Sequence, residues 1–148
     1  IMMHSTIAEK MSADHRHCDD LFAAAESSVG QGEWGEARAD FSSFNQVMEH
    51  HLRMEEEILF PEFEARTGQQ GGPTEIMRGE HAQMRDLFLS MSEAVSESDQ
   101  SGYLGSSETL LWIIQQHNSK EENILYPMID NMLSSEVDLL LQKLSQLD

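Results

Sequence analysis

Four long stretches of the 148-residue chain carry an apolar residue at every third or fourth position. This spacing gathers apolar side chains on one face of an α-helix, whereas a strand would alternate apolar and polar residues, which no segment of this chain does. The pattern therefore predicts an all-α protein. Four helices are expected over residues 6–30, 35–67, 73–95 and 107–133, and a shorter Leu-rich helix over residues 135–147.

Turn-forming residues mark where these helices end. Gly30 closes the first helix, and the run from Gly68 to Pro73 is the clearest linker in the chain. Pro61 removes a backbone hydrogen bond, so it is expected to bend the second helix or to end its regular part. The polar stretch 96–105 is interpreted as a loop. These connections predict an up-down-up-down four-helix bundle in a single domain, residues 1–148, with the C-terminal helix packed across its end.

One segment occurs twice. It reads His-Leu-Arg-Met-Glu-Glu-Glu-Ile-Leu-Phe-Pro from position 51 and His-Asn-Ser-Lys-Glu-Glu-Asn-Ile-Leu-Tyr-Pro from position 117, an offset of 66 residues. A further His precedes each copy by 36 residues, at positions 15 and 81. The chain is therefore predicted to consist of two repeated halves, residues 6–67 and 73–133, related by an approximate two-fold axis.

The repeated histidines and glutamates are candidate metal ligands. In each copy the His and the Glu lie four positions apart, which places both on one face of a helix. One such pair alone is more often a surface pair, but two copies, each preceded by a core-facing His at the same interval, favour a metal site. His17 and His50 are not expected to bind metal, because glutamines stand at their repeat counterparts, and His4 is not expected to bind either. The six candidates are His15, His51, Glu55, His81, His117 and Glu121.

Four imidazoles and two carboxylates are too many groups for one ordinary metal ion. They suit two ions that share Glu55 and Glu121 as bridges, with coordination positions left open for a small molecule. This donor set favours iron or zinc over calcium and magnesium, which prefer oxygen ligands, and manganese is also compatible with it. Ferritin-like di-iron bundles use Glu-x-x-His with mainly carboxylate ligands. The larger share of imidazole here indicates binding of diatomic molecules rather than iron storage.

Polar residues beside the candidates are interpreted as structural. Glu56 and Glu122 are expected to be solvated or to support a ligand from outside rather than to bind metal. Two interpretations of Asp14 and Glu80 stay open, orientation of a neighbouring imidazole and a position on a solvated face, of which the solvated face is favoured. Cys18 is expected to be a small buried hydrophobe, and a lone cysteine, which has no partner for an internal disulfide, agrees with a reducing compartment.

The composition makes some partners and locations unfavourable. A formal net charge of −18 repels nucleic acid and anionic membranes, so neither is expected as a partner. The chain has no run of about 18 apolar residues, and its N-terminus lacks a basic region followed by an apolar stretch. The sequence therefore supports neither a membrane span nor a signal peptide, and it predicts a cytoplasmic protein.

These residues resemble the hemerythrin family, in the broad sense that includes bacterial HHE cation-binding domains. The resemblance covers about residues 6–133 and rests on Asp14-His15, on Glu80-His81 and on the two repeated segments. It implies a four-helix bundle around a non-haem di-iron centre, with oxo- or hydroxo-bridged iron and the six candidates as ligands. Oxygen carriers of this family have a further His one turn before the third-helix ligand, where this chain has Met77. The chain is thus similar to the four-His, two-Glu members.

The sequence leaves three functions open. The resemblance implies a di-iron protein that binds O2, NO or a related small ligand for sensing, scavenging or iron and oxygen handling, with a protein redox partner compatible with this role. The alternative is an enzyme that acts on peroxide or nitric oxide, or in iron-centre repair, at the same site. Repair and NO-handling members commonly have a Cys-bearing N-terminal region, which is not found in the residues before His15. The third is a structural zinc site.

Overall fold

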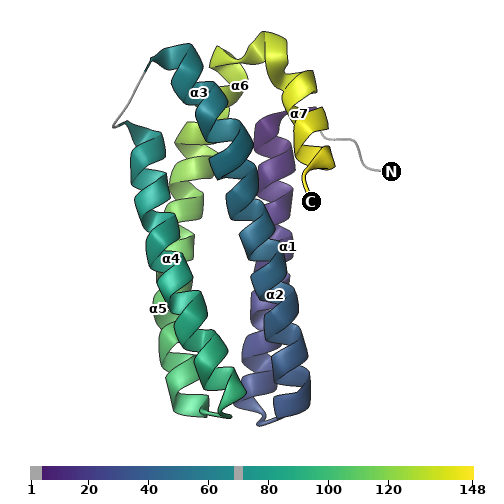
Figure 1. The fold of residues 1–148 in the computed structure, drawn as a ribbon, viewed down its shortest axis with the longest axis vertical. Coiled ribbons are helices and arrows are strands. Elements are labelled where there is room, and N and C mark those ends of the chain that lie inside the picture. The colour runs from purple at the N-terminus through teal and green to yellow at the C-terminus, as the bar shows by residue number, and fades with distance from the viewer. Residues whose placement is uncertain (1–4, 69–71) are drawn as a thin grey trace.

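The computed structural model describes residues 5–68 and 72–148, and all regular structure in these ranges is helical (Figure 1). The prediction of an all-α helical bundle is confirmed. His4 and the middle of the predicted linker, residues 69–71, lie outside the described residues. The elements are α1 (Ile7–Gly30), α2 (Trp34–Met54), η1 (Glu55–Leu59), α3 (Phe60–Thr67), α4 (Pro73–Ser96), α5 (Gln100–Lys120), η2 (Glu121–Leu125), α6 (Tyr126–Met132), η3 (Ser134–Glu136) and α7 (Val137–Gln146).

Four long helical segments run in alternating directions along the bundle (Figure 1). α1 packs against α2 and α5, and α4 packs against the same two helices, so that each long helix has two neighbours. After α6 the chain turns back, and α7 packs against α1 and η1 at one end of the bundle. Within residues 5–68 and 72–148, no helix combines the length and the apolar character that crossing a bilayer requires.

Two side chains fasten the start of α1. The Thr6 hydroxyl accepts a hydrogen bond from the backbone N–H of Glu9 at 3.1 Å. The carboxylate of Asp130 on α6 accepts from the N–H groups of Ile7 at 2.7 Å and Ala8 at 3.0 Å. The first N–H groups of a helix have no partner within the helix, so these bonds stabilise its beginning. The Asp130 bonds also hold the start of α1 against the second half of the chain.

A π-helical turn interrupts each of the repeated segments. η1 begins at Glu55 and η2 at Glu121, and each ends one residue before the aromatic-Pro pair of its segment. The N–H of Phe60 donates to the carbonyl of Glu55, and that of Tyr126 donates to the carbonyl of Glu121, five residues earlier. The following proline has no N–H and crowds the carbonyl four residues before it, which a wider turn accommodates. The predicted effect of Pro61 therefore takes the form of a π turn that begins at a candidate ligand.

The connection between α4 and α5 is much shorter than predicted. α4 ends at Ser96 and α5 begins at Gln100, so the interpretation of residues 96–105 as a loop was wrong. The Asp99 carboxylate caps α5 by accepting from the N–H of Gly102 at 3.0 Å. Tyr103 is buried in the core, whereas its polar neighbours on this first turn face solvent. A helix start with one apolar residue per turn carries too weak a periodic pattern to be distinguished from a loop.

The apolar core is divided into two clusters. A large cluster lies toward the α1–α2 and α4–α5 connections and includes Phe22, Phe44 and Phe88. A second cluster, the end cluster, includes Phe63 of α3 and Leu140 of α7. The two clusters meet at about the same level on all four long helices, and each helix has a candidate histidine near this level. On α1, for example, His15 lies between Met11 of the end cluster and Cys18 of the large cluster. The fold thus brings four histidines to the same height in the bundle.

Candidate metal centre

All six candidate ligands lie inside the bundle and meet at this level. They come from α1, α2, η1, α4, α5 and η2, and each is at most 3% exposed. The other described histidines lie apart from them, because His17 is exposed and Nε2 of His50 contacts the backbone carbonyl of Leu147 at 2.9 Å. The four histidines related by the 66-residue repeat are therefore the ones that cluster in the structure.

The donor atoms fall into two groups, each within 4.8 Å across. Site A consists of Glu55, His81, His117 and Glu121, and site B consists of His15, His51 and Glu121. In site A, Nε2 of His81 lies 3.1 Å from Oε1 of Glu55, and Nε2 of His117 lies 3.2 Å from Oε1 of Glu121. In site B, Nε2 of His15 lies 3.1 Å from the same Glu121 oxygen. Two neighbouring groups that share one carboxylate have an arrangement suited to two metal ions. Glu55 was predicted to be shared as well, but of the two glutamates only Glu121 belongs to both groups.

Site A contains buried polar atoms that make no hydrogen bond. These atoms are Oε1 of Glu55, Nε2 of His81, Nε2 of His117 and Oε2 of Glu121. A buried polar atom without a partner costs about 1–3 kcal/mol, and such atoms are few in native proteins. Two carboxylate oxygens and two imidazole nitrogens, gathered in one place, are donors that a cation would satisfy together once it displaces any proton from the imidazoles. The residues present therefore fit a bound metal ion.

A carboxylate holds the outer nitrogen of each candidate histidine. Because a carboxylate only accepts, Nδ1 carries the proton and Nε2 is left free to bind metal at the centre. Each pair joins neighbouring helical segments, and the four pairs together link α1 to α2, η1 to α4, α4 to α5 and η2 to α1 in a closed ring. The pairs are Asp14 with His51 at 2.6 Å, Glu56 with His81 at 2.7 Å, Glu80 with His117 at 2.7 Å and Glu122 with His15 at 2.7 Å.

The favoured interpretation of Asp14 and Glu80 as solvated was therefore wrong, and the alternative, that they orient imidazoles, describes their positions. Each precedes a candidate histidine on its own helix, and that position points sideways toward the next helix rather than out to water. The Asp14 side chain is 15% exposed and the Glu80 side chain 21%. Glu56 and Glu122 support imidazoles in the same way, which is the supporting role that the sequence had left open beside solvation.

The carboxylates of the ring differ in their own partners. The Arg85 guanidinium donates to both oxygens of Glu56, at 2.8 and 3.0 Å, and Lys120 donates to Glu80. Burial opposes ionisation of Glu56, but its bonds with His81 and Arg85 lower its pKa to about 2. In the part of the chain that the structure describes, no Lys or Arg forms an ion pair with Asp14 or Glu122. Cations thus neutralise the carboxylates behind site A, and those behind site B keep more of their charge.

Tyr126 is a member of the centre that the sequence interpretation missed. Its hydroxyl lies 2.8 Å from Oε2 of Glu55, 3.0 Å from Oε1 of Glu121 and 3.1 Å from Nε2 of His15. Burial, followed by the two nearby carboxylates, raises the pKa of Tyr126. Its repeat counterpart Phe60 has no hydroxyl, and its ring stacks on that of His81 at 5.8 Å. In the sequence, this difference is visible as a Phe in the first repeat and a Tyr at the equivalent position of the second.

The carboxylates around the centre raise the pKa values of two histidines. Burial opposes the charge on His15, but bonds to Glu121 and Glu122 outweigh it and raise its pKa from 6.5 to about 9. Burial also opposes the charge on His81, but the nearby carboxylates of Glu55 and Glu56 outweigh it and raise its pKa to about 9. Metal binds only the neutral imidazole, so protons compete with metal below this pH.

We therefore expect the stability of the metal-free protein to fall as the pH rises. A folded-state pKa of about 9, above 6.5, means that His15 and His81 contribute stability fully below pH 6.5 and lose it as the pH passes through 9. Thermal unfolding in excess chelator should show a lower Tm at pH 9.5 than at pH 6.5. His17→Gln, at an exposed position, should leave this decline unchanged. A Tm that is constant or rises over this range would contradict the protonation of the two histidines.

Asp14→Ala should weaken metal binding at site B. The substitution removes the acceptor that fixes the His51 ring, and losing such an outer partner typically lowers metal affinity about 10–100-fold. Competition with a chromophoric chelator measures this loss. Asp20→Ala, at an exposed position on the same helix, is the matched control and should bind metal like the unmodified protein. Equal affinities of the two variants would show that the Asp14–His51 bond does not support the site.

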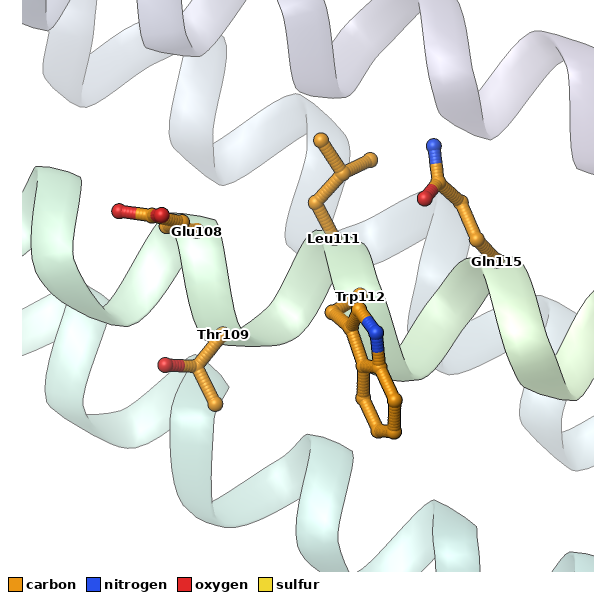
Figure 2. Close-up of a pocket in the computed structure, with 5 residues that line it drawn as sticks. All are labelled: Glu108, Thr109, Leu111, Trp112 and Gln115. Atoms are coloured by element: carbon orange, nitrogen blue, oxygen red, sulfur yellow. The ribbon is translucent and has the colours of Figure 1, made fainter.

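The described part of the chain also has a surface pocket that is separate from the candidate metal centre (Figure 2). It has a volume of about 460 Å³ and is lined by α5 residues Glu108, Thr109, Leu111, Trp112 and Gln115, none of which is a candidate ligand. Trp112 is 66% exposed, and Figure 2 shows it beside Leu111 on the same helix. This pocket is formed by the side of one helix, and Glu108 is the only titratable residue among those that line it. It therefore offers no chemistry comparable to that of the buried metal centre.

The fold and the centre together define a metal-binding helical-bundle protein. A family model described as the hemerythrin HHE cation binding domain matches residues 6–129. The chain therefore belongs to the hemerythrin HHE family, as its repeated His and Glu residues indicated. No curated protein and no solved structure was found to match it.

Proposed function

We propose that the chain is a non-haem di-iron protein that binds O2, NO or a related small ligand for sensing, scavenging or iron and oxygen handling. The observation that carries the proposal is the pair of buried donor groups that share Glu121, each with two imidazoles. His and carboxylate donors suit iron better than calcium or magnesium. Membership of the HHE family supports a role that depends on bound metal.

Iron held by His and carboxylate ligands, with coordination positions left open, supplies a place where a small molecule can bind. Residues of the chain orient the metal ligands and exclude bulk water from the centre. The ring of four carboxylates orients the imidazoles, and the two apolar clusters above and below the centre keep bulk water away from it. Met11 and Met77 are buried in the end cluster next to the centre. Met77 thus leaves the place of the carriers' additional His without a nitrogen donor.

The test combines elemental analysis with absorption spectroscopy. Protein from iron-replete cells should contain two irons per chain, and the anaerobically reduced form should develop new visible charge-transfer absorption when O2 or NO is added. His117→Ala, which removes a site A donor, should lose iron and the response together. Two bound irons with an unchanged spectrum would overturn the proposed binding of diatomic ligands.

Two other outcomes would identify the alternative functions. Zinc at high occupancy with an inert spectrum would indicate a structural site. Decay of peroxide or NO over many cycles, lost in His117→Ala, would indicate an enzyme, whereas a reaction that stops at one equivalent per centre would support binding. Each measurement uses the full chain, and far-ultraviolet circular dichroism shows whether the variant keeps its helices.

A further inference from the structure

The hydroxyl oxygen of Tyr126 lies among the donor atoms of site B, and we propose that it is a further ligand of the metal ion held there. The inference rests on the proposed function only in that site B holds a metal. Tyr126 follows the π turn η2, which begins at Glu121, and the phenol reaches the centre from the end-cluster side. It is fully buried, so the hydroxyl meets the centre rather than water.

The distances around the hydroxyl are those expected of donors that share one ion. When a metal binds nitrogen and oxygen atoms at about 2.1 Å and neighbouring bonds are perpendicular, adjacent donors lie about 3.0 Å apart. The Tyr126 oxygen lies 2.8 Å from Oε2 of Glu55, which belongs to site A. It also lies 3.1 Å from Nε2 of His15, 3.4 Å from Nε2 of His51 and 3.0 Å from Oε1 of Glu121. The His15, His51 and Glu121 atoms belong to the three residues of site B. The hydroxyl therefore completes the same cluster.

Without Tyr126, the two sites have different numbers of donor residues. Site A gathers four donor residues and site B only three. Tyr126 gives site B a fourth, while its repeat counterpart Phe60 contributes only a ring stacked on His81 of site A. The single hydroxyl that breaks the repeat thus lies on the side of the centre that has fewer donors. Phenolate is a known ligand of iron, as in the haem iron of catalase.

The chemistry of this step involves no oxidation or reduction. The O–H bond of the Tyr126 phenol breaks, the oxygen keeps the electron pair and forms a bond to the metal, and the proton leaves to water, as in metal binding by other protonated ligands. The phenolate adds one negative charge beside Asp14 and Glu122, for which the structure shows no Lys or Arg ion pair within the described ranges. This surplus of negative charge favours a highly charged ion at site B.

The chain offers a matched pair of variants for the test, because it contains only two tyrosines. Tyr126→Phe removes only the hydroxyl and installs the residue found at the repeat counterpart. Tyr103→Phe removes the other phenol, which is buried in the large cluster. Metal-free protein is loaded with ferric iron, and tyrosinate is followed by visible charge-transfer absorption and resonance Raman scattering. A second sample is loaded with zinc ion, and ionised phenol is followed by ultraviolet difference spectroscopy.

We expect the tyrosinate signal in the unmodified protein and in Tyr103→Phe, and its complete loss in Tyr126→Phe. Metal bound without a tyrosinate signal, or a signal that survives Tyr126→Phe, would overturn the inference. If Tyr126→Phe fails to fold, the comparison of the unmodified protein with Tyr103→Phe still assigns the signal. An iron form that responds to O2 or NO without tyrosinate overturns only this inference. If the zinc-loaded protein shows tyrosinate but the iron-loaded protein does not respond to O2 or NO, only the proposed function is overturned.

Discussion

Glu121→Gln is expected to remove metal from both sites at once. Glu121 belongs to both donor groups, whereas the other candidates each belong to one. Glutamine keeps the size of the side chain, but its neutral amide is a much weaker donor than a carboxylate. Loss of an outer partner typically costs about 10–100-fold in metal affinity, so loss of this shared ligand should cost more than about 100-fold. Elemental analysis after dialysis should therefore find the variant nearly free of metal.

Two further variants show whether this loss is specific. Glu57→Gln removes a glutamate that forms an exposed pair with Arg53, and it should keep its full metal content. Glu55→Gln changes a residue of site A only, so it should lose metal from site A before site B. Retention of metal at both sites in Glu121→Gln would refute the shared carboxylate.

Removal of the metal should lower the stability of the whole bundle. Without metal, four buried donor atoms at site A have no partner. A ligand that binds only the folded state at about 1,000 times its Kd stabilises it by about 4 kcal/mol. In a domain of this size each kcal/mol corresponds to about 2–4 °C, so the Tm should fall by about 8–16 °C on chelation. Differential scanning calorimetry of chelated and reloaded protein measures this change.

Glu121→Gln is the control for this experiment too. Because the variant is expected to bind little metal, adding metal or chelator should leave its Tm nearly constant. A metal-dependent shift of equal size in this variant would mean that the ion acts elsewhere, for example on the acidic surface. No shift in the unmodified protein would mean that the centre is stable without metal and that the ion is bound for its chemistry alone.

The six candidate ligands could be recognised in the sequence because each is part of a local, repeated pattern. His51 and Glu55 share one helix face through their spacing, and the second copy repeats that spacing. The same periodic pattern placed His15 and His81 toward the core. Helices with strong periodicity were predicted close to their observed bounds. The start of α5 was not, because its first turn buries only Tyr103.

The surroundings of the ligands could not be predicted in the same way. Asp14 supports His51 across 37 positions, and Glu122 supports His15 across 107. Such pairs depend on which helices are neighbours, and a local pattern does not contain that information. An acidic residue beside a helix face is also most often solvated, so the general expectation for Asp14 and Glu80 was wrong here.

The sequence by itself determined the class of fold, the repeat and the six residues that meet at the centre, because helix periodicity and residue spacing are local properties. Only the tertiary structure decided the closed ring of carboxylates, the different charges behind the two sites and the place of Tyr126. These features arise where helices distant in the chain touch. The π turn before Tyr126 adds a further rotation that an ideal helix would not have, and it carries the hydroxyl to the donor atoms.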